Sequence, residues 1–492
     1  MTSTSTSSGP TASARSDRTS VPAPLLRDPA KRWWVLVTIA LAQLMVVLSV
    51  TIANIALPDA QAALDMTASQ RQWVITGYAL AFGGLLLLGG RLGDLFGRRN
   101  TFVIGLVGFA LASVVAGAAP TFVVLAVARV AQGIFGAILA PAALAVLTTT
   151  FTEPSERARA FGVFSAISGA GAGIGLLAGG ALTSALSWRW CFFLQVPFAV
   201  LGIIGALTLL NNARPAQRPR IDYLGAVLAV AGLASIVLGM TQASTSGWAS
   251  ASTICLTVAG VLLLAVFTWV ESRHAEPLLP LRVVRDRDRA ASFLAVLVVA
   301  LAAAGVFFFL TFYLQTVMGL SAMMTGLAFM PMVLTIMATS VVVNTRLLPR
   351  FGPRWLVPAG MLLAAAGLVL LAQLTPTSSY WASIVPALIL VGLGYGTILA
   401  SGMSRATLGV LPEHAGAAGG LVNTSQQIGL AIGTALLAAV AAGVTGTDPS
   451  AAAAVAGYSA AYLVGAGIFV AGAVVEVFLF RSQRAAAPAA AH

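Results

Sequence analysis

Apolar residues are gathered into about fourteen stretches that alternate with short polar connections. A membrane-spanning helix needs about 20 predominantly apolar residues, and each stretch is long enough to supply them. The predicted spans lie approximately at 34–58, 71–90, 101–119, 121–150, 158–185, 189–210, 223–243, 252–272, 290–315, 323–343, 355–373, 381–408, 417–442 and 457–480. No connection between them is long enough to hold a soluble domain. The pattern therefore predicts an all-α polytopic membrane protein.

Basic residues mark one side of this series of spans. Of the 27 Lys and Arg residues, 24 lie in the N-terminal tail, the even-numbered connections or the C-terminal tail. The exceptions are Arg71 and Arg189 in odd-numbered connections, and Arg129 inside a span. Short loops rich in Lys and Arg stay in the cytoplasm. We therefore expect a multi-pass protein of the bacterial inner membrane with both termini in the cytoplasm.

Composition supports this class and excludes others. The chain is 59% hydrophobic and 9% charged, whereas soluble domains use roughly 25% charged residues. The net charge of +12 is spread over short loops without an aromatic-basic patch, which favours lipid headgroups over nucleic acid as a partner. Cys191 and Cys255 stand in or near separate spans, so no metal site is expected. No phosphate-binding Gly-x-x-x-x-Gly-Lys-Ser/Thr loop occurs, and no cofactor is expected.

A nine-residue motif occurs twice in the chain. Arg-Leu-x-x-x-Phe-Gly-x-Arg stands at 91–99 and again at 346–354, each time in the connection after a predicted span. Internal repeats of this kind are typical of transporters whose site lies between two related halves. We expect an N-terminal half at 33–210, two inserted spans at 211–289 and a C-terminal half at 290–480. The polar segments 1–32 and 481–492 are predicted to be cytoplasmic tails, the first of them disordered.

Three further motifs carry a family resemblance. The first connection that contains the repeat reads Gly-x-Leu-x-Asp-x-x-Gly-Arg-Arg through Gly90, Leu92, Asp94, Gly97, Arg98 and Arg99. The fourth span contains Arg129, Gln132, Gly133 and Gly136. The fifth span contains Gly171, Gly175, Gly179 and Gly180, with Leu176 where the corresponding motif has proline. With these motifs the chain resembles the fourteen-span drug:proton antiporter branch of the major facilitator superfamily.

The resemblance implies a secondary transporter that exports lipophilic drugs or antibiotics in exchange for protons, by alternating access. Its ligands would be a lipophilic small molecule and protons, within a lipid bilayer, and we expect a monomer. One departure from the branch affects the proton step. The first span of the branch usually carries an acidic residue just before the Thr51–Pro58 stretch, and this chain has Ser49 there.

Asp94 is the acidic residue of the first motif. It stands at the cytoplasmic end of the second span among Arg91, Arg98 and Arg99. A carboxylate there can pair with arginines and with a helix N-terminus when the cytoplasmic side is closed. The resemblance implies such a gate latch, and the alternative is a solvated loop charge of little energetic consequence.

Arg129 is the one basic residue inside a predicted span. A charged side chain at that depth is costly and indicates function. Arginine does not release its proton at physiological pH, so Arg129 is a candidate to influence a neighbouring carboxylate or to bind a polar or anionic substrate group. The alternative is a structural arginine that donates to backbone carbonyls.

The acid that would carry protons is not settled by the sequence. Glu476 is the one acidic residue clearly within a span, and we interpret it as snorkelling toward the interface. Asp59, near the outer end of the first span, either loads protons from outside or faces water.

Neutral polar residues are the remaining cavity candidates. They suit a bulky, mostly hydrophobic ligand with a few polar groups, although such residues also join helices to one another. The candidates are Gln43, Ser49, Asn54, Gln132, Asn423, Gln426 and Gln427. Because no acid accompanies them, we expect neutral or anionic amphiphiles to be preferred over quaternary ammonium dyes.

Other classes of function remain as alternatives. A transporter of an ordinary metabolite would share the repeat and the spans. A membrane-embedded enzyme would need His and acidic residues at one depth, but His274, His414 and His492 are scattered over cytoplasmic segments. The repeat, with the gate latch that the resemblance implies at Asp94, argues against a receptor.

Overall fold

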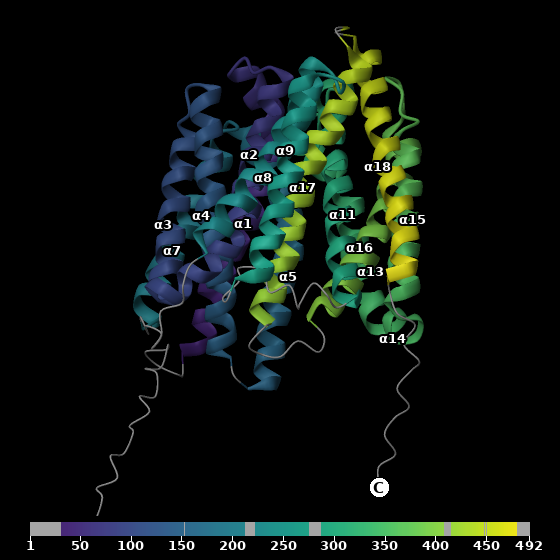
Figure 1. Ribbon diagram of the computed structural model, residues 1–492. Helices are drawn as coiled ribbons and strands as arrows, with labels where there is room; N and C mark the ends of the chain where they lie inside the picture. Colours follow the sequence, from purple (N-terminus) through teal and green to yellow (C-terminus); the bar gives the residue numbers. More distant parts are fainter. Residues whose placement is uncertain are drawn as a thin grey trace, which may run out of the picture.

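The computed structural model describes residues 31–151, 153–211, 222–274, 287–407, 415–446, 448 and 450–479. The described chain forms an upright bundle of long helices (Figure 1), and the all-α fold is confirmed. Twelve of its helical segments are long and apolar enough to cross a membrane. The tails, apart from Lys31 and Arg32, and most of the connection between residues 272 and 289 lie outside the described residues.

Two further helices bear on the expected number of fourteen spans. These are α2 (Ala68–Phe96) and α5 (Pro154–Ala185), of 29 and 32 residues. Each is a continuous helix that contains some residues whose side chains are not described. Their length is sufficient for a span at a rise of about 1.5 Å per residue, and the exact count of fourteen stays a prediction.

The helices of the predicted N-terminal half pack around α1 and α4. Besides α2 and α5, its helices are α1 (Arg32–Ala63), α3 (Arg98–Gly117), α4 (Phe122–Thr150), α6 (Trp190–Phe193) and α7 (Gln195–Leu209). Helix α4 packs against α2 and α3, while α1 packs against α5 and α7. The span expected at 189–210 is therefore two helices, α6 and α7, that meet at Leu194. Pro197 has no N–H to donate to the carbonyl four residues earlier, which favours a break there.

The C-terminal half contains helices with π-helical turns at their ends. Its elements are α11 (Arg287–Phe312), η2 (Tyr313–Val317), α12 (Ala322–Ala328), α13 (Met330–Val342), η3 (Val343–Leu347), α14 (Leu348–Phe351), α15 (Pro353–Leu371), η4 (Tyr380–Ile384), α16 (Val385–Thr407), α17 (Ala415–Thr445) and α18 (Ala451–Leu479). The span expected at 323–343 is interrupted at Phe329, between α12 and α13. Pro331, at the start of α13, again explains the interruption.

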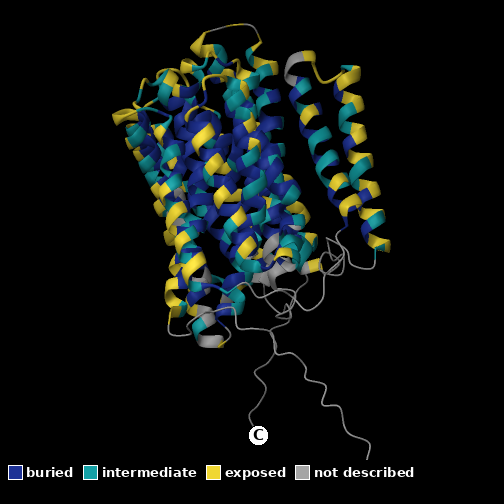
Figure 2. Cartoon of the chain, turned by 90° about the vertical axis from the view of Figure 1, so that its left-hand side faces the viewer, coloured by how far each residue is buried: buried dark blue, intermediate teal, exposed yellow. Residues whose placement is uncertain are grey.

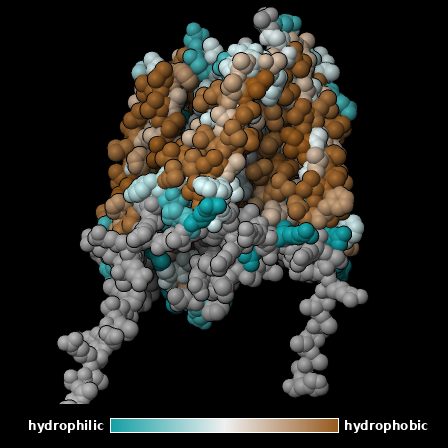
Figure 3. Space-filling view, in the orientation of Figure 1, coloured by the Kyte–Doolittle hydropathy of each residue, from teal (hydrophilic) through white to brown (hydrophobic). Residues whose placement is uncertain are grey.

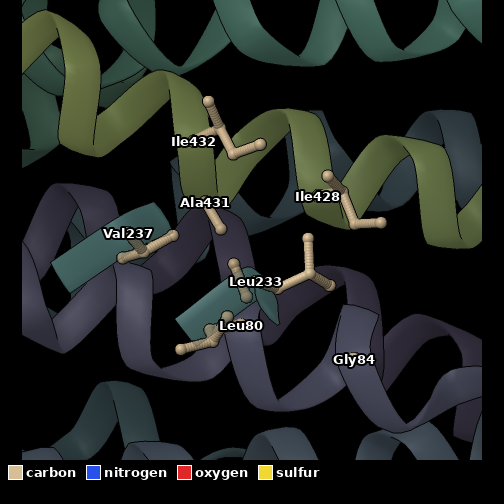
Figure 4. A pocket seen from close by; sticks show the side chains of 8 residues that line it. Leu80, Gly84, Leu233, Val237, Ile428, Ala431 and Ile432 are labelled. Atoms are coloured by element: carbon tan, nitrogen blue, oxygen red, sulfur yellow. The ribbon is translucent and has the colours of Figure 1, made fainter. Parts of the chain in front are cut away.

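The two helices that we predict to be inserted lie where the predicted halves meet. Helices α8 (Tyr223–Ser246) and α9 (Ala251–Arg273) pack on each other, and Figure 2 shows the pair at the right of the bundle. Helix α8 also contacts α2 and α17. Where the three helices meet, apolar side chains that include Leu80, Val237 and Ile432 line a narrow crevice (Figure 4). The pair therefore touches both halves at once.

The duplicated motif adopts the same turn in both halves. Gly97 follows α2 with φ 84° and ψ 142°, and Gly352 follows α14 with φ 68° and ψ 167°. Positive φ is accessible to glycine without a steric penalty. Each turn leads directly into a helix, α3 or α15. The Phe-Gly pair of the repeat thus specifies the same sharp reversal twice.

The surface has the pattern expected of a protein embedded in lipid. Figure 3 shows a broad band of hydrophobic side chains, with hydrophilic ones gathered toward the two ends. Large apolar side chains of the described helices are exposed, for example Val127 at 63% and Leu362 at 52%. Helix α1 begins and α18 ends at the same end of the bundle (Figure 1). We call this the α1-start end, and the other the α1–α2 end.

Candidate functional site

A buried polar cluster occupies the interior of the N-terminal half. We call it the Arg129 cluster, and its members are Arg129 and Gln132 on α4, Ser49 on α1, Ser113 on α3 and Gln195 on α7. All five side chains are at most 1% exposed. Buried polar groups are costly unless they are hydrogen-bonded, so their partners decide what the cluster does.

The Arg129 guanidinium donates to two neighbouring helices, α1 and α2, and to Gln132 of its own helix α4. Its Nε donates to the Val74 carbonyl at 3.0 Å. Its Nη1 donates to the Ser49 hydroxyl at 2.8 Å and to the Ser49 carbonyl at 3.3 Å. The Gln132 Oε1 accepts from the same nitrogen at 2.9 Å. The guanidinium carbon also lies 4.3 Å from the centre of the Tyr78 ring, a cation–π distance.

Gln132 extends this network to two more helices. Its Nε2 donates to the Ser113 hydroxyl at 2.7 Å and to the Gln195 Oε1 at 3.3 Å. Ser113 donates to the Phe109 carbonyl at 2.7 Å. The cluster therefore joins α1, α2, α3, α4 and α7, with neutral groups around a charged one.

The geometry matches one of the two interpretations of Arg129. Two of its acceptors are backbone carbonyls, and no carboxylate bonds to it among the described residues. A hydrogen bond to a charged group contributes about 1.5–3 kcal/mol. The structure therefore supports Arg129 as a residue that holds helices together. Ser49 supplies a hydroxyl where the branch has an acid, and a carboxylate there would face the guanidinium directly.

The other neutral candidates lie apart from this network. Asn54 is 6% exposed and donates to the Val50 carbonyl of its own helix at 2.9 Å, and Gln43 is half-buried on α1. On α17, Gln426 is exposed, whereas Gln427 is buried and its Oε1 has no hydrogen-bond partner. The structure thus places Gln427, next to Gly83 of α2, at a contact between the halves.

The gate motif forms the turn from α2 to α3. Thr101 Oγ1 donates to the Leu92 carbonyl at 3.1 Å, which closes the turn. Arg98 Nη1 donates to the Ala145 carbonyl of α4 at 3.5 Å. Arg99 is half-buried, and its Nε has no hydrogen-bond partner. The side chain of Asp94 lies outside the described part, so its latch role stays a prediction. Gly90 lies on α2 near Pro141 of α4.

Helix α5 uses its glycines on two faces. A side-chain carbon added at Gly171 would lie 3.1 Å from Val47 of α1, and one added at Gly175 would collide with the Thr51 hydroxyl. Gly179 faces Ile52 in the same way. These three therefore let α5 and α1 pack at backbone distance.

The fourth glycine of that motif faces the other half. An added carbon at Gly180 would lie 2.6 Å from the Ala322 carbonyl of α12. From the opposite side, Gly326 of α12 lies against the Leu176 carbonyl. Leu176, in place of the motif's proline, therefore stands at the α5–α12 contact.

Hydrogen bonds between the halves gather at the α1–α2 end in the described chain. The Met323 N–H donates to Ser184 Oγ at 3.0 Å, which joins α12 to α5. Gln315 Nε2 donates to the Ile55 carbonyl at 3.1 Å, which joins η2 to α1. This end of the bundle is therefore closed.

Arg71 strengthens the same closure. Its guanidinium carbon lies 3.8 Å from the centre of the Phe312 ring and 4.9 Å from that of Phe308, both on α11. Sequence reasoning placed Arg71 in a connection and missed this contact. The available signal was an aromatic run in the ninth predicted span, at residues 307–309 and 312, which could accept a basic side chain.

The acidic residues differ sharply in environment. Asp59 is exposed, and Glu156 forms an ion pair with Arg32 at 2.6 Å. Glu476 is 0% exposed, and both of its carboxylate oxygens are buried without a hydrogen-bond partner. The prediction that Glu476 snorkels to the interface is therefore wrong, because neighbouring helices enclose the carboxylate. In the described part of the chain, no three His, Cys, Asp or Glu side chains are placed to hold a metal ion.

Comparison with known proteins gives the family. The family model for the Major Facilitator Superfamily matches residues 39–434. The chain is 47% identical over 471 residues to the puromycin resistance protein pur8 of Streptomyces alboniger, covering 94% of this chain and 93% of that one. It is 37% identical to the cephamycin export protein CmcT of Amycolatopsis lactamdurans, covering 84% and 86%.

Solved structures agree on the fold. The POT family transporter PepTSo matches with a TM-score of 0.66 at 14% identity, over 92% of this chain and 98% of that one. The family model and these relatives give one assignment: the chain belongs to the Major Facilitator Superfamily and is a transporter, not an enzyme.

Proposed function

We propose that this protein exports lipophilic antibiotics from the bacterial cytoplasm in exchange for protons. The observation that carries the proposal is the 47% identity, over nearly the whole chain, to a protein named for puromycin resistance. Relatives named for cephamycin export and lincomycin resistance point the same way. Puromycin is therefore the first substrate to test.

The mechanism we propose is alternating access, in which the two ends of the bundle close in turn. In the structure, Ser184–Met323 and Ile55–Gln315 hydrogen bonds join the halves at the α1–α2 end. If the basic loops are cytoplasmic, that end faces outward and this conformation is closed to the outside. The gate motif around Asp94 lies at the other end of α2. Its carboxylate would pair with arginines when the α1-start end closes, so the two sets of contacts would form in alternate states.

The substrate class follows from the polar groups of the N-terminal half. The Arg129 cluster contains one positive charge, neutral partners and no described acid. A permanently charged cation would find no compensating carboxylate in the Arg129 cluster, and an unpaired charge in an apolar cavity is costly. We therefore propose neutral or anionic amphiphiles as preferred substrates. The transporter would act as a monomer in the lipid bilayer.

Everted membrane vesicles test the proposal. In such vesicles the cytoplasmic face is outside, so export appears as uptake of labelled compound. The panel is puromycin, lincomycin and a quaternary ammonium dye, each with and without a protonophore, and vesicles without the protein are the control. We expect uptake of puromycin that the protonophore abolishes. Uptake of no compound, or uptake that the protonophore leaves unchanged, would refute the antiport proposal.

A further inference from the structure

Glu476 is a buried acid that no part of the site so far explains. It lies on α18, is 0% exposed, and neither carboxylate oxygen has a hydrogen-bond partner. Helix α18 packs against α11, α15 and α17. These helices therefore decide what surrounds the carboxylate.

Helices α11 and α15 place apolar residues at the level of Glu476. One turn before Glu476 on the same face, an added carbon at Gly472 would lie 3.2 Å from Met361 Sδ of α15 and 3.2 Å from Val298 Cγ1 of α11. Both helices run antiparallel to α18. The step from Gly472 to Glu476, about 6 Å along α18, therefore corresponds to about one turn toward the beginning of α11 and of α15. That step reaches the level of Val357 and Ala295, which are both 0% exposed.

A hydroxyl group lies at a similar depth on α16. The Tyr395 and Phe469 rings are 5.9 Å apart, which fixes the relative level of α16 and α18. Six residues further along α16 is Ser401, and seven residues further along α18 is Glu476. At about 1.5 Å per residue the two stand at nearly the same depth. Ser401 is 0% exposed, and its hydroxyl also has no hydrogen-bond partner.

On α11 and α15, the described positive charges lie toward the α1-start end of the bundle. On α15 the single charged residue is Arg354, whose Nε is buried without a hydrogen-bond partner. On α11, Arg287 and Arg289 stand at the beginning of the helix, where the side chain of Asp288 is not described. Helix α17 has no titratable residue. Neither Glu476 nor Arg354 forms an ion pair in the described structure.

These surroundings decide the protonation of the carboxyl group. An ionised carboxylate among apolar walls, without hydrogen bonds or a counter-charge, is far more costly than a neutral acid. These surroundings therefore favour the neutral form of Glu476. Arg354, about one turn nearer the α1-start end, would stabilise the ionised form if the two side chains met.

We propose that Glu476 is the proton-carrying carboxyl group of the transport cycle. It holds its proton in the conformation closed at the α1–α2 end. When a movement of α18 against α15 brings it to Arg354 and to water, the O–H bond breaks, the proton passes to cytoplasmic water and the carboxylate pairs with the guanidinium. The inference rests on the proposed antiport and supplies the acid that Ser49 does not.

The test uses full-length protein in proteoliposomes, with two modes of labelled puromycin transport. One mode is uptake driven by an imposed pH gradient, and the other is exchange between equal puromycin concentrations without a gradient. Glu476→Gln should reduce gradient-driven uptake to the level of protonophore-treated wild type, while exchange continues near the wild-type rate. Asp65→Asn, which alters an exposed acid in the connection between α1 and α2, is the matched control and should behave as wild type.

The outcomes distinguish a failure of the antiport proposal from a failure of the Glu476 assignment. Gradient-driven uptake that persists in Glu476→Gln would overturn the inference and leave antiport standing. Wild type that exchanges puromycin but ignores the gradient would overturn antiport, and the inference with it. Infrared spectroscopy provides a measurement independent of substrate. A carboxylic acid C=O band at neutral pH, present in wild type and absent in Glu476→Gln, is expected, and its presence in both would refute the assignment.

Discussion

The two halves of this transporter bury charge in opposite ways. In the N-terminal half, Arg129 is 1% exposed and donates to Val74, Ser49 and Gln132. In the C-terminal half, Glu476 is 0% exposed and has no hydrogen-bond partner. A fully bonded buried charge stabilises one arrangement, whereas an unsatisfied buried acid costs free energy in every arrangement that leaves it there. The difference suggests that one half provides a rigid interior and the other a group able to change its charge.

The largest effect should come from removing the bonded charge. Arg129→Ala leaves Gln132 Oε1, Ser49 and a backbone carbonyl buried without their donor, and should lower the free energy of unfolding by about 3 kcal/mol or more. Thermal unfolding in detergent measures this. Glu476→Met is the counterpart in the other half and should leave stability unchanged or raise it by about 1 kcal/mol. A destabilised Glu476→Met protein together with a normal Arg129→Ala protein would reverse the comparison.

Transport without loss of folding should be most sensitive at the α5–α1 contact. At Gly175 any side chain meets the Thr51 hydroxyl, so Gly175→Leu should abolish export while membrane abundance stays near normal. The matched control is Gly467→Leu on α18, where an added carbon meets nothing within 4 Å. Export of puromycin from everted vesicles is the measurement. Normal export by Gly175→Leu would mean that the close packing of α5 on α1 is not required for transport.

The duplicated turn allows the halves to be compared residue by residue. Asp94 stands in the first copy, and Pro349 occupies its position in the second. Asp94→Asn should therefore lower export several-fold at normal abundance, while Arg350→Ala in the second copy should have a milder effect. Export rates normalised to protein level decide between them. Equal effects from the two variants would remove the asymmetry of the gate.

Much of the fold could be predicted from the sequence because its signals are local. Apolar stretches of spanning length and the Phe-Gly turn of the repeat depend on neighbouring residues only. The breaks at Leu194 and Phe329 were missed, although Pro197 and Pro331 stood nearby. A proline within a membrane helix is compatible with a kink as well as a break.

The site was less accessible to sequence reasoning because its contacts join distant segments. Arg129, Gln132 and Ser49 were singled out, but Ser113 and Gln195 entered the cluster only in the structure. The snorkelling of Glu476 was an inference from its distance to the end of the helix. Which face of α18 meets α11 and α15 decides its burial, and helical position alone does not reveal that face.

The smallest effect should come from adding a buried acid beside Arg129 in the N-terminal half. Ser49→Asp places a carboxylate where the hydroxyl now lies 2.8 Å from Arg129 Nη1. The pair would be stabilising, and a second acid in the transporter should extend resistance to quaternary ammonium dyes. Minimum inhibitory concentrations for such a dye and for puromycin, in wild type, Ser49→Asp and Ser49→Ala, provide the measurement. Strong wild-type export of the dye would contradict the proposed substrate class.

Proton release on substrate binding tests the account most directly. Purified protein in detergent and weak buffer is mixed with puromycin while a pH indicator records the protons set free, and binding is measured in parallel. The account predicts release by wild type, and no release by Glu476→Gln at unchanged puromycin binding. Release that persists in Glu476→Gln, or binding by wild type without release, would contradict it.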